Sequence, residues 1–318
     1  ERNGALLWID AADPDLLAGI DVGKISTHQK VSGAALVNYR KAVMNDDIAW
    51  SIIAVPSAKW AAKVFPHLPE NEQVDALWDA IFKTVRIGDG DAVEAWHEHV
   101  ANLEKRAAQL NAKRYKALHY KAPGTDLTIE LPEKHLWLTG GSKTPQGTTF
   151  IANMPTEEVY TMPAKYGVDG TVSNTKPLVY KGNIIDQFTL TFKNGKIVKA
   201  HAQVGNDLLQ QLITTDEGSS YLGEVALVPH QSPISASNIL YYNTLFDENA
   251  SNHLAIGEAY PTCYEGGREL EQGQLESLGI NTSVTHEDFM IGSGEMDIDG
   301  ELADGTMEPI FRKGNWAF

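Results

Sequence analysis

The stretch DAVEAWHEHVANLEKRAAQLNAKRYKALHYKAPGTDLTIELP, residues 91–132, contains the point at which the pattern of apolar residues changes along the chain. Its first part repeats apolar residues at helical spacing, which predicts one long amphipathic helix. Its last part alternates Leu127 and Ile129 with polar residues, as half-buried strands do. The change of period predicts two domains, residues 1–118 and residues 119–318.

Segments before this point alternate between strand and helix. ALLWID (residues 5–10) and AWSIIAVP (49–56) are short and apolar, as buried strands are, whereas SAKWAAKVFP (57–66) and ENEQVDALWDAIFKTVRI (70–87) have helical patterns. Strands that alternate with helices indicate a parallel or mixed sheet flanked by helices. We therefore expect residues 1–118 to be an α/β scaffold with a Rossmann-like, mostly parallel sheet.

Segments after this point are short and rich in strand patterns. FTLTFKNGKIVKAHAQV, residues 188–204, predicts a hairpin whose Asn194-Gly195 turn has type I′ geometry. Residues 119–318 are therefore expected to form a β-rich, mixed α+β domain. Further turns are predicted at Asp169-Gly170, Lys181–Asn183, Asp299-Gly300 and Asp304-Gly305.

The composition excludes several classes of function. The 318 residues are 42% hydrophobic and carry a net charge of −16, which is ordinary for a globular protein but repels nucleic acids and anionic lipid surfaces. No apolar run approaches the roughly 20 residues that span a bilayer. The single cysteine, Cys263, cannot form an intrachain disulfide, so a cytoplasmic location is the simpler expectation. We predict no nucleic-acid partner and no membrane association.

Several short motifs have a simpler explanation than a functional site. His97 and His99 diverge on a helix, so we expect both to face solvent rather than one metal ion. The stretch GSGEMDIDGE, residues 292–301, lacks the alternating acids of a calcium loop and is better explained by a hairpin turn. The glycines do not have the spacing of a P-loop or a dinucleotide-binding turn, and no G-x-S-x-G motif is present.

The best candidates for chemistry are charged residues inside apolar segments. His286 and Asp288, in SVTHEDFMIGSGEMDIDG, point to the same side only if this segment is a strand. An isolated pair of this kind is more often a hydrogen-bonded histidine beside a solvated carboxylate at a strand edge than a metal site. Glu224, in YLGEVALVP, is more informative, because a single carboxylate in an apolar strand requires a partner. A divalent cation is one adequate partner, and a salt bridge is the alternative.

Two further segments add possible metal donors, NMPTEEVYTMP and NTLFDENASNHLAIGEAYPT. Several carboxylates and two histidines are what a two-metal hydrolytic site requires, although each segment alone is also explained by surface acids or salt bridges. Nitrogen and oxygen donors suit zinc, cobalt or manganese, with magnesium as a further candidate. The polar residues in these two segments are Glu157, Glu158, Asp247, Glu248, His253 and Tyr260.

These four segments, in this order, resemble the metallopeptidase family of bacterial aminopeptidase T and aminopeptidase S. The likeness extends through WAAKVFP, LHYKAPGTDLTIELP and TKPLVYKGNIID, so it covers nearly the whole chain. It implies an N-terminal α/β domain, a mixed catalytic domain that binds metal, and a homodimer. It also implies that the chain lacks the first part of the family's N-terminal domain, which agrees with a sequence that begins within a strand pattern and without methionine.

The resemblance also implies roles for individual residues. It makes Tyr260 the active-site tyrosine and leaves Glu157 as a neighbour of a ligand. Glu287 departs from the family pattern, which usually has a small apolar residue there, but a strand residue at this position should face away from the site. The implied metal ligands are Glu158, Glu224, Glu248, His253, His286 and Asp288.

We therefore expect an aminopeptidase in which two divalent metal ions activate water to remove the N-terminal residue of short peptides with a free N-terminus. Tyr260 would donate a hydrogen bond to the oxyanion, and Glu248 or Glu157 would carry the proton to the leaving amine. Two alternatives are a metal-binding protein of the same fold without turnover, and a glycosidase that uses Glu158 and Glu224 as its acid and base. Removal of metal by a chelator would separate these functions.

Overall fold

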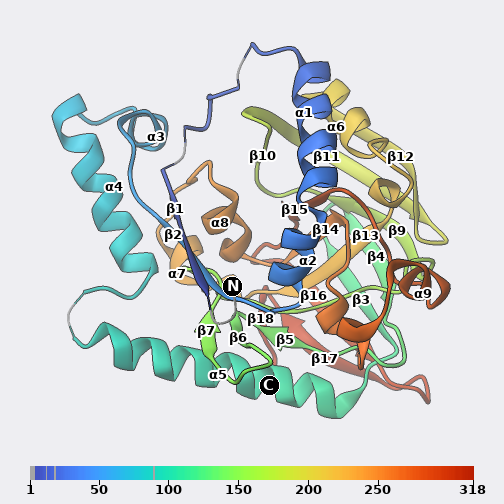
Figure 1. Ribbon diagram of the computed structural model, residues 1–318. Coiled ribbons are helices and arrows are strands. Elements are labelled where there is room, and N and C mark those ends of the chain that lie inside the picture. Colours follow the sequence, from blue (N-terminus) through green and yellow to red (C-terminus); the bar gives the residue numbers. More distant parts are fainter. Residues whose placement is uncertain (1–3, 12, 18, 89) are drawn as a thin grey trace.

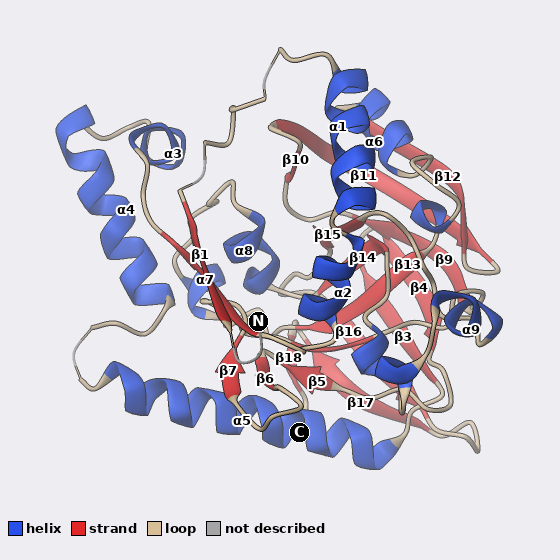
Figure 2. Ribbon diagram, viewed as in Figure 1, coloured by secondary structure: helices blue, strands red, loops and turns tan. Residues whose placement is uncertain are grey.

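The computed structural model describes residues 4–11, 13–17, 19–88 and 90–318. This part of the chain forms four sheets with helices around them. Figures 1 and 2 show the strand-rich second half of the chain grouped together, with several helices of the first half beside it. The fold is therefore of the predicted α/β class.

The N-terminal part contains β1 (Ala5–Asp10) and β2 (Ala49–Ala54), which pair in parallel. Both strands coincide with predicted ones, so the expectation of parallel pairing is confirmed. β2 also contacts a segment of the second half, because Ile52 exchanges backbone hydrogen bonds with Ala152 and Met154 at 2.8 and 3.0 Å. The helices of this part are α1 (Val22–Ala35), α2 (Val37–Met44), α3 (Ala58–Val64), α4 (Glu70–Thr84) and α5 (Ala92–Lys113).

The long predicted helix is α5, which runs along the lower edge of the view in Figure 1. Its N-cap is Asp91, whose carboxylate accepts hydrogen bonds from the first turn, and it ends at Arg114 in a left-handed conformation. Two residues of its apolar stripe are buried in different clusters, Leu110 in the core of the two larger sheets and Trp96 in a cluster formed mainly by helices. Among the described residues, none of the helices combines the length and the apolar character that a bilayer crossing requires.

The large sheet is the scaffold of the second half. Its strands pair in antiparallel fashion in the order β10-β11-β9-β4-β3-β16-β17-β18, and β12 pairs with β11. The strands are β3 (Ala117–Ala122), β4 (Thr125–Glu130), β9 (Val168–Ser173), β10 (Leu178–Tyr180), β11 (Asn183–Lys193), β12 (Lys196–Val204), β16 (Asp297–Glu301), β17 (Met307–Arg312) and β18 (Asn315–Trp316).

A second antiparallel sheet, which we call the site sheet, has the order β15-β14-β13-β8-β5. It packs on the large sheet through a shared core, in which the rings of Phe188 and Phe289 lie 5.6 Å apart. Burial of each such ring contributes about 1.5–3 kcal/mol. The strands are β5 (Leu138–Thr139), β8 (Val159–Thr161), β13 (Leu222–Leu227), β14 (His253–Gly257) and β15 (His286–Met290).

The remaining elements are short and lie in the second half. The strands β6 and β7 pair with each other, and the helices connect strands of the two larger sheets. They are β6 (Gly141–Lys143), β7 (Thr149–Ile151), α6 (Asn206–Leu212), α7 (Pro233–Ala236), α8 (Thr244–Asp247), α9 (Gln272–Ser277) and the 3₁₀ helices η1 (Gly218–Ser220), η2 (Glu248–Ala250), η3 (Pro261–Cys263) and η4 (Gly267–Glu269).

Two of the predicted turns are wrong. The turns at Asn194-Gly195, Lys181–Asn183 and Asp304-Gly305 are present, the first with φ of 49° and 79° as type I′ requires. Asp169-Gly170 instead lies inside β9, and Asp299-Gly300 lies inside β16. These glycines permit close packing, because a Cβ at Gly170 would lie 2.2 Å from a backbone oxygen of β4 and one at Gly300 would lie 2.6 Å from the Tyr115 ring.

Candidate metal centre

The predicted site residues lie in neighbouring strands of the site sheet or in segments next to them. Antiparallel pairing aligns Glu224 with Ala255, and Ala255 with Asp288, so residues far apart in sequence form one row. All seven predicted residues line one cavity of about 90 Å³. They are Glu158 before β8, Glu224 in β13, Glu248 in η2, His253 in β14, Tyr260 before η3, and His286 and Asp288 in β15.

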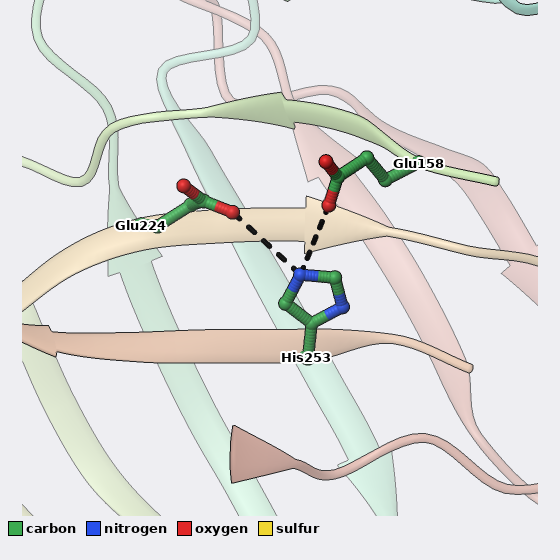
Figure 3. Close-up of side chains that lie close together, drawn as sticks. All are labelled: Glu158, Glu224 and His253. Atoms are coloured by element: carbon green, nitrogen blue, oxygen red, sulfur yellow. Dashed lines mark ion pairs between the residues drawn. The ribbon is translucent and has the colours of Figure 1, made fainter. Parts of the chain in front are cut away.

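One group of possible ligands consists of Glu158, Glu224 and His253, which Figure 3 shows pointing toward one another. The Nε2 atom of His253 lies 3.1 Å from Oε2 of Glu158 and 3.6 Å from Oε1 of Glu224. All three side chains are buried. Burial alone would lower the pKa of His253, but hydrogen bonds to the two carboxylates raise it well above its usual value.

A second group consists of Glu224, His286 and Asp288. The Nε2 atom of His286 lies 3.6 Å from Oε2 of Glu224 and 3.7 Å from Oδ1 of Asp288. The Nδ1–H of His286 donates to the backbone carbonyl of Glu258 at 2.7 Å, which leaves Nε2 directed at the carboxylates. The segment is a strand, as the convergence of His286 and Asp288 requires.

Glu224 belongs to both groups, and each of its oxygens faces a different histidine. Burial raises its pKa to about 7, and the neighbouring carboxylates also act in this direction. Oδ1 of Asp288 is buried and accepts no hydrogen bond from the residues that the structure describes. Crowded carboxylates, an unsatisfied buried oxygen and imidazole nitrogens directed at the carboxylates are a donor set that fits divalent cations.

Glu248 lines the cavity but lies outside both groups of closely spaced ligand atoms in the described residues. One of its oxygens accepts a hydrogen bond from Nδ2 of Asn249 at 3.3 Å. Burial, followed by the charge of Asp288, raises its pKa well above the usual value for a glutamate. Glu248 therefore combines access to the cavity with a strong tendency to hold a proton.

Tyr260 lies immediately before η3, with its ring 4.9 Å from that of His286. Burial raises the pKa of Tyr260 well above 10, and the charges of Glu224 and Asp288 add to this effect. Its hydroxyl consequently remains protonated and can act as a hydrogen-bond donor in the cavity.

The N-terminal part contributes to the wall of the cavity, which the sequence did not suggest. The end of α2 brings Val43 and Met44 to it, the following loop brings Asp46, and β2 brings Trp50. Asp46 is held by an ion pair with Arg268 at 2.7 Å. The first half is therefore more than a scaffold, but these residues carry no sequence signal for this role.

The prediction for His99 is wrong. His97 is exposed, as expected, but the His99 side chain is only 11% exposed. It contacts Arg86 at 3.0 Å and the carbonyl of Thr156 at 2.7 Å. The segment before β8 covers this side of α5, which helical periodicity alone could not reveal. Glu287 does not line the cavity, in agreement with its alternate position on β15.

Comparison with known protein families matches residues 1–316 to the thermophilic metalloprotease family M29. The chain belongs to this family. The peptidase is 56% identical to aminopeptidase AmpS of Bacillus subtilis (strain 168), over 100% of its length and 78% of the relative. It is 41% identical to aminopeptidase T of Thermus thermophilus, over 99% of its length and 77% of the relative. The resemblance inferred from the motifs is confirmed.

Its fold agrees with that of a solved relative. The structure of wild-type AmpT from Thermus thermophilus superimposes with a TM-score of 0.91 at 40% identity, and the match covers 99% of the peptidase and 77% of the relative. Membership of a metalloprotease family implies that the peptidase uses divalent metal ions and acts on peptides. Two groups of possible metal ligands line the cavity.

Proposed function

We propose that this metal-dependent aminopeptidase removes the N-terminal residue of short peptides with two divalent ions, for which Glu224 would be a shared ligand. The observation that supports this most directly is the position of Glu224, whose two oxygens each lie 3.6 Å from a different histidine. Glu158 and His253 would complete one ion site, and His286 and Asp288 the other. Zinc, cobalt and manganese suit these nitrogen and oxygen donors best, and magnesium is a further candidate.

The chain's own residues would perform distinct tasks around the substrate. When bound, the two ions would polarise the scissile carbonyl and lower the pKa of the attacking water. The Tyr260 hydroxyl, protonated at working pH, would donate a hydrogen bond to the carbonyl oxygen as negative charge develops on it. The cavity carboxylates would hold the free α-ammonium group of the substrate, which favours cleavage at the N-terminus.

We assign the proton transfer to Glu248 rather than to Glu157. Glu248 lines the cavity and lies outside both groups of ligand atoms, so its carboxylate would be available to accept a proton from water and deliver it to the leaving amine. The Glu157 carboxylate is occupied by both terminal nitrogens of Arg86. Glu157 is therefore a poor proton carrier.

We also propose a homodimer in the cytoplasm. The dimer is carried over from the family resemblance. The cytoplasmic location rests on the sequence, which has a single cysteine that is buried in the structure, as is usual for proteins of reducing compartments.

Metal removal tests the proposal. We expect a chelator to abolish hydrolysis of aminoacyl amides, and zinc, cobalt or manganese to restore it with two ions bound per chain. Glu224→Gln should lower the metal content and reduce kcat by at least about 100-fold, because both ions lose a shared ligand. Glu287→Gln is the matched control, since it alters a neighbouring carboxyl group that does not line the cavity.

Three results would contradict the proposal. Full activity in chelator would favour a metal-independent hydrolase, such as the glycosidase alternative. Two bound ions without hydrolysis of any aminoacyl amide would leave a metal-binding protein. Wild-type metal content in Glu224→Gln would exclude a bridging role for this residue.

A further inference from the structure

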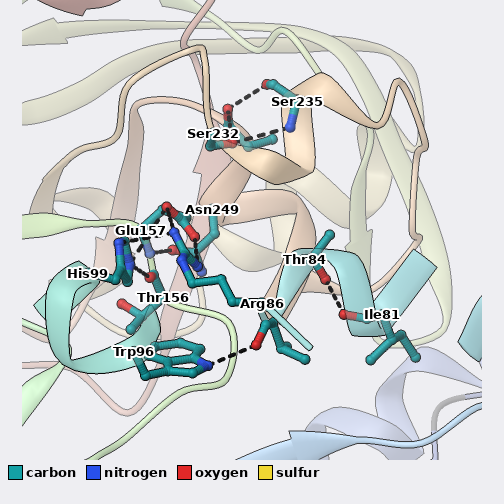
Figure 4. A network of polar contacts seen from close by, with 12 residues as sticks. Ile81, Thr84, Arg86, Trp96, His99, Thr156, Glu157, Ser232, Ser235 and Asn249 are labelled. Atoms are coloured by element: carbon teal, nitrogen blue, oxygen red, sulfur yellow. Dashed lines mark hydrogen bonds and ion pairs between the residues drawn. The ribbon is translucent and has the colours of Figure 1, made fainter. Parts of the chain in front are cut away.

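A buried polar network connects the end of α4 to the segment that carries Glu158 (Figure 4). Arg86, two residues after α4, binds Glu157 through both terminal nitrogens, at 2.6 and 2.9 Å. The side chains of Arg86 and Glu157 are only 18% and 5% exposed. Such a bidentate pair fixes the position and the orientation of the carboxylate.

The guanidinium of Arg86 is held from two other sides. It lies over the Trp96 ring, 5.4 Å from the centroid, and its Nη2 donates to Nδ1 of His99 at 3.0 Å. The remaining ring nitrogen of His99 therefore carries the proton and donates to the carbonyl of Thr156 at 2.7 Å. Arg86 itself has φ of 60°, which a non-glycine residue rarely adopts.

Asn249 joins this network to the second carboxylate-bearing segment. It is fully buried, and its Oδ1 accepts the backbone N–H of Glu157 at 2.7 Å. Its Nδ2 donates to the carbonyl of Leu245 at 3.1 Å and to Oε1 of Glu248 at 3.3 Å. One side chain thus links the backbone next to Glu158 with the carboxylate of Glu248.

The hydroxyls of Ser232 and Ser235 support η2 from the other side. Both donate to the carbonyl of Ala250, at 3.1 and 2.5 Å (Figure 4). The segment that carries Glu248 and Asn249 is therefore held between α7 and the segment before β8.

We propose that Arg86, Glu157 and Asn249 are positioning residues that hold Glu158 and Glu248 in place for metal binding and proton transfer. The inference rests on the proposed two-metal function. Glu158 lies near Glu224, and two buried carboxylates repel each other before a cation arrives. His99 and Asn249 hydrogen-bond to the backbone of Thr156 and Glu157, which keeps the neighbouring Glu158 from moving away from Glu224. The protein then has to reorganise less when an ion binds.

The test measures metal binding by the full chain rather than activity alone. We expect Arg86→Lys and Asn249→Ser to weaken zinc affinity about 10- to 100-fold in competition with a chromophoric chelator, the range known for partners that orient metal ligands. The visible absorption of the cobalt-loaded protein should change as well, because the ligand geometry changes. Arg312→Lys is the matched control, since Arg312 forms an exposed ion pair with Asp299 and does not line the cavity.

The outcomes are distinguishable. Folded Arg86→Lys and Asn249→Ser proteins with wild-type zinc affinity and a wild-type cobalt spectrum would overturn the positioning role. If Arg86→Lys does not fold, Asn249→Ser and Glu157→Gln decide by the same two measurements. A wild-type protein that binds fewer than two ions would overturn the two-metal function and this inference with it.

Discussion

Tyr260 combines burial with the negative charge of the carboxylates around it, and both raise its pKa. We expect Tyr260→Phe to lower kcat about 10²–10³-fold, the cost of losing one preorganised donor to an oxyanion. Metal content should not change, because both groups of possible ligands are already formed by carboxylate and imidazole side chains. Steady-state kinetics and metal analysis on the same preparation measure both quantities.

Tyr264→Phe is the control for this prediction. Tyr264 packs in the same small apolar cluster as Tyr260, but it does not line the cavity. Its variant should retain the wild-type kcat. A Tyr260→Phe enzyme with a kcat within twofold of the wild type would remove the hydroxyl from the mechanism.

For single residues, the sequence was informative where a charged side chain stands among apolar neighbours. A carboxylate in an apolar strand, such as Glu224, predicts a partner without any knowledge of the fold. Arg86, His99 and Asn249 have ordinary surroundings in the sequence. Their partners are 71, 57 and 92 residues away, so only the fold brings them together.

At the scale of the element, β9 depends on a glycine where β4 passes close to it. Gly170 has φ of 123° and pairs with Leu127. We expect Gly170→Ala to lower the free energy of unfolding by roughly 2–5 kcal/mol, because a left-handed backbone costs about 1–2 kcal/mol and overpacking about 1–3 kcal/mol. Denaturant unfolding of the metal-free protein measures the change.

Gly273→Ala is the matched control. Gly273 lies in α9, and a Cβ there would meet no atom within 4 Å. Alanine is favoured over glycine in a helix, so this variant should be neutral or up to about 1 kcal/mol more stable. Equal stability of Gly170→Ala and the wild type would show that β4 and β9 can separate without cost.

The sequence could predict elements that local patterns determine, but not the role of every glycine inside a strand. The helix α5 and the β11–β12 hairpin are determined by local patterns, and both were predicted. The glycines of β9 and β16 were taken for turns, because a glycine required by a neighbouring strand has the same local signal as one required by a turn. What requires these two glycines is the close approach of Asp126 to Gly170 and of Tyr115 to Gly300. No local sequence pattern connects these pairs.

At the scale of the whole molecule, strand order determines the site. The order β15-β14-β13-β8 brings Glu158 and Asp288 to one cavity, although 130 positions separate them in the sequence. Chemistry and family resemblance indicated which residues belong together. The strand order, and the contribution of α2, β2 and the loop between them to the cavity wall, depend on long-range packing that sequence periodicity does not encode.

His135 connects several parts of the molecule and should make global stability depend on pH. It is 2% exposed; its Nδ1–H donates to the carbonyl of Pro132 at 2.7 Å, and its buried Nε2 has no partner among the described residues. Its backbone carbonyl accepts from Arg114, and it bridges to Tyr264. Burial lowers the pKa of His135, and the charge of Arg114 lowers it further, whereas the Pro132 carbonyl and Glu265 oppose the shift.

A folded pKa below the unfolded value of about 6.5 means that the unfolded chain binds the proton more readily. The stability from neutral His135 is therefore fully present above pH 6.5 and is lost as the pH falls, by at most about 1.4 kcal/mol per pH unit.

The difference in unfolding free energy between the wild type and His135→Gln should shrink between pH 7.5 and pH 5 in denaturant titrations. A difference for His135→Gln that is independent of pH would mean that the folded protein accepts the proton on His135 as readily as the unfolded chain does.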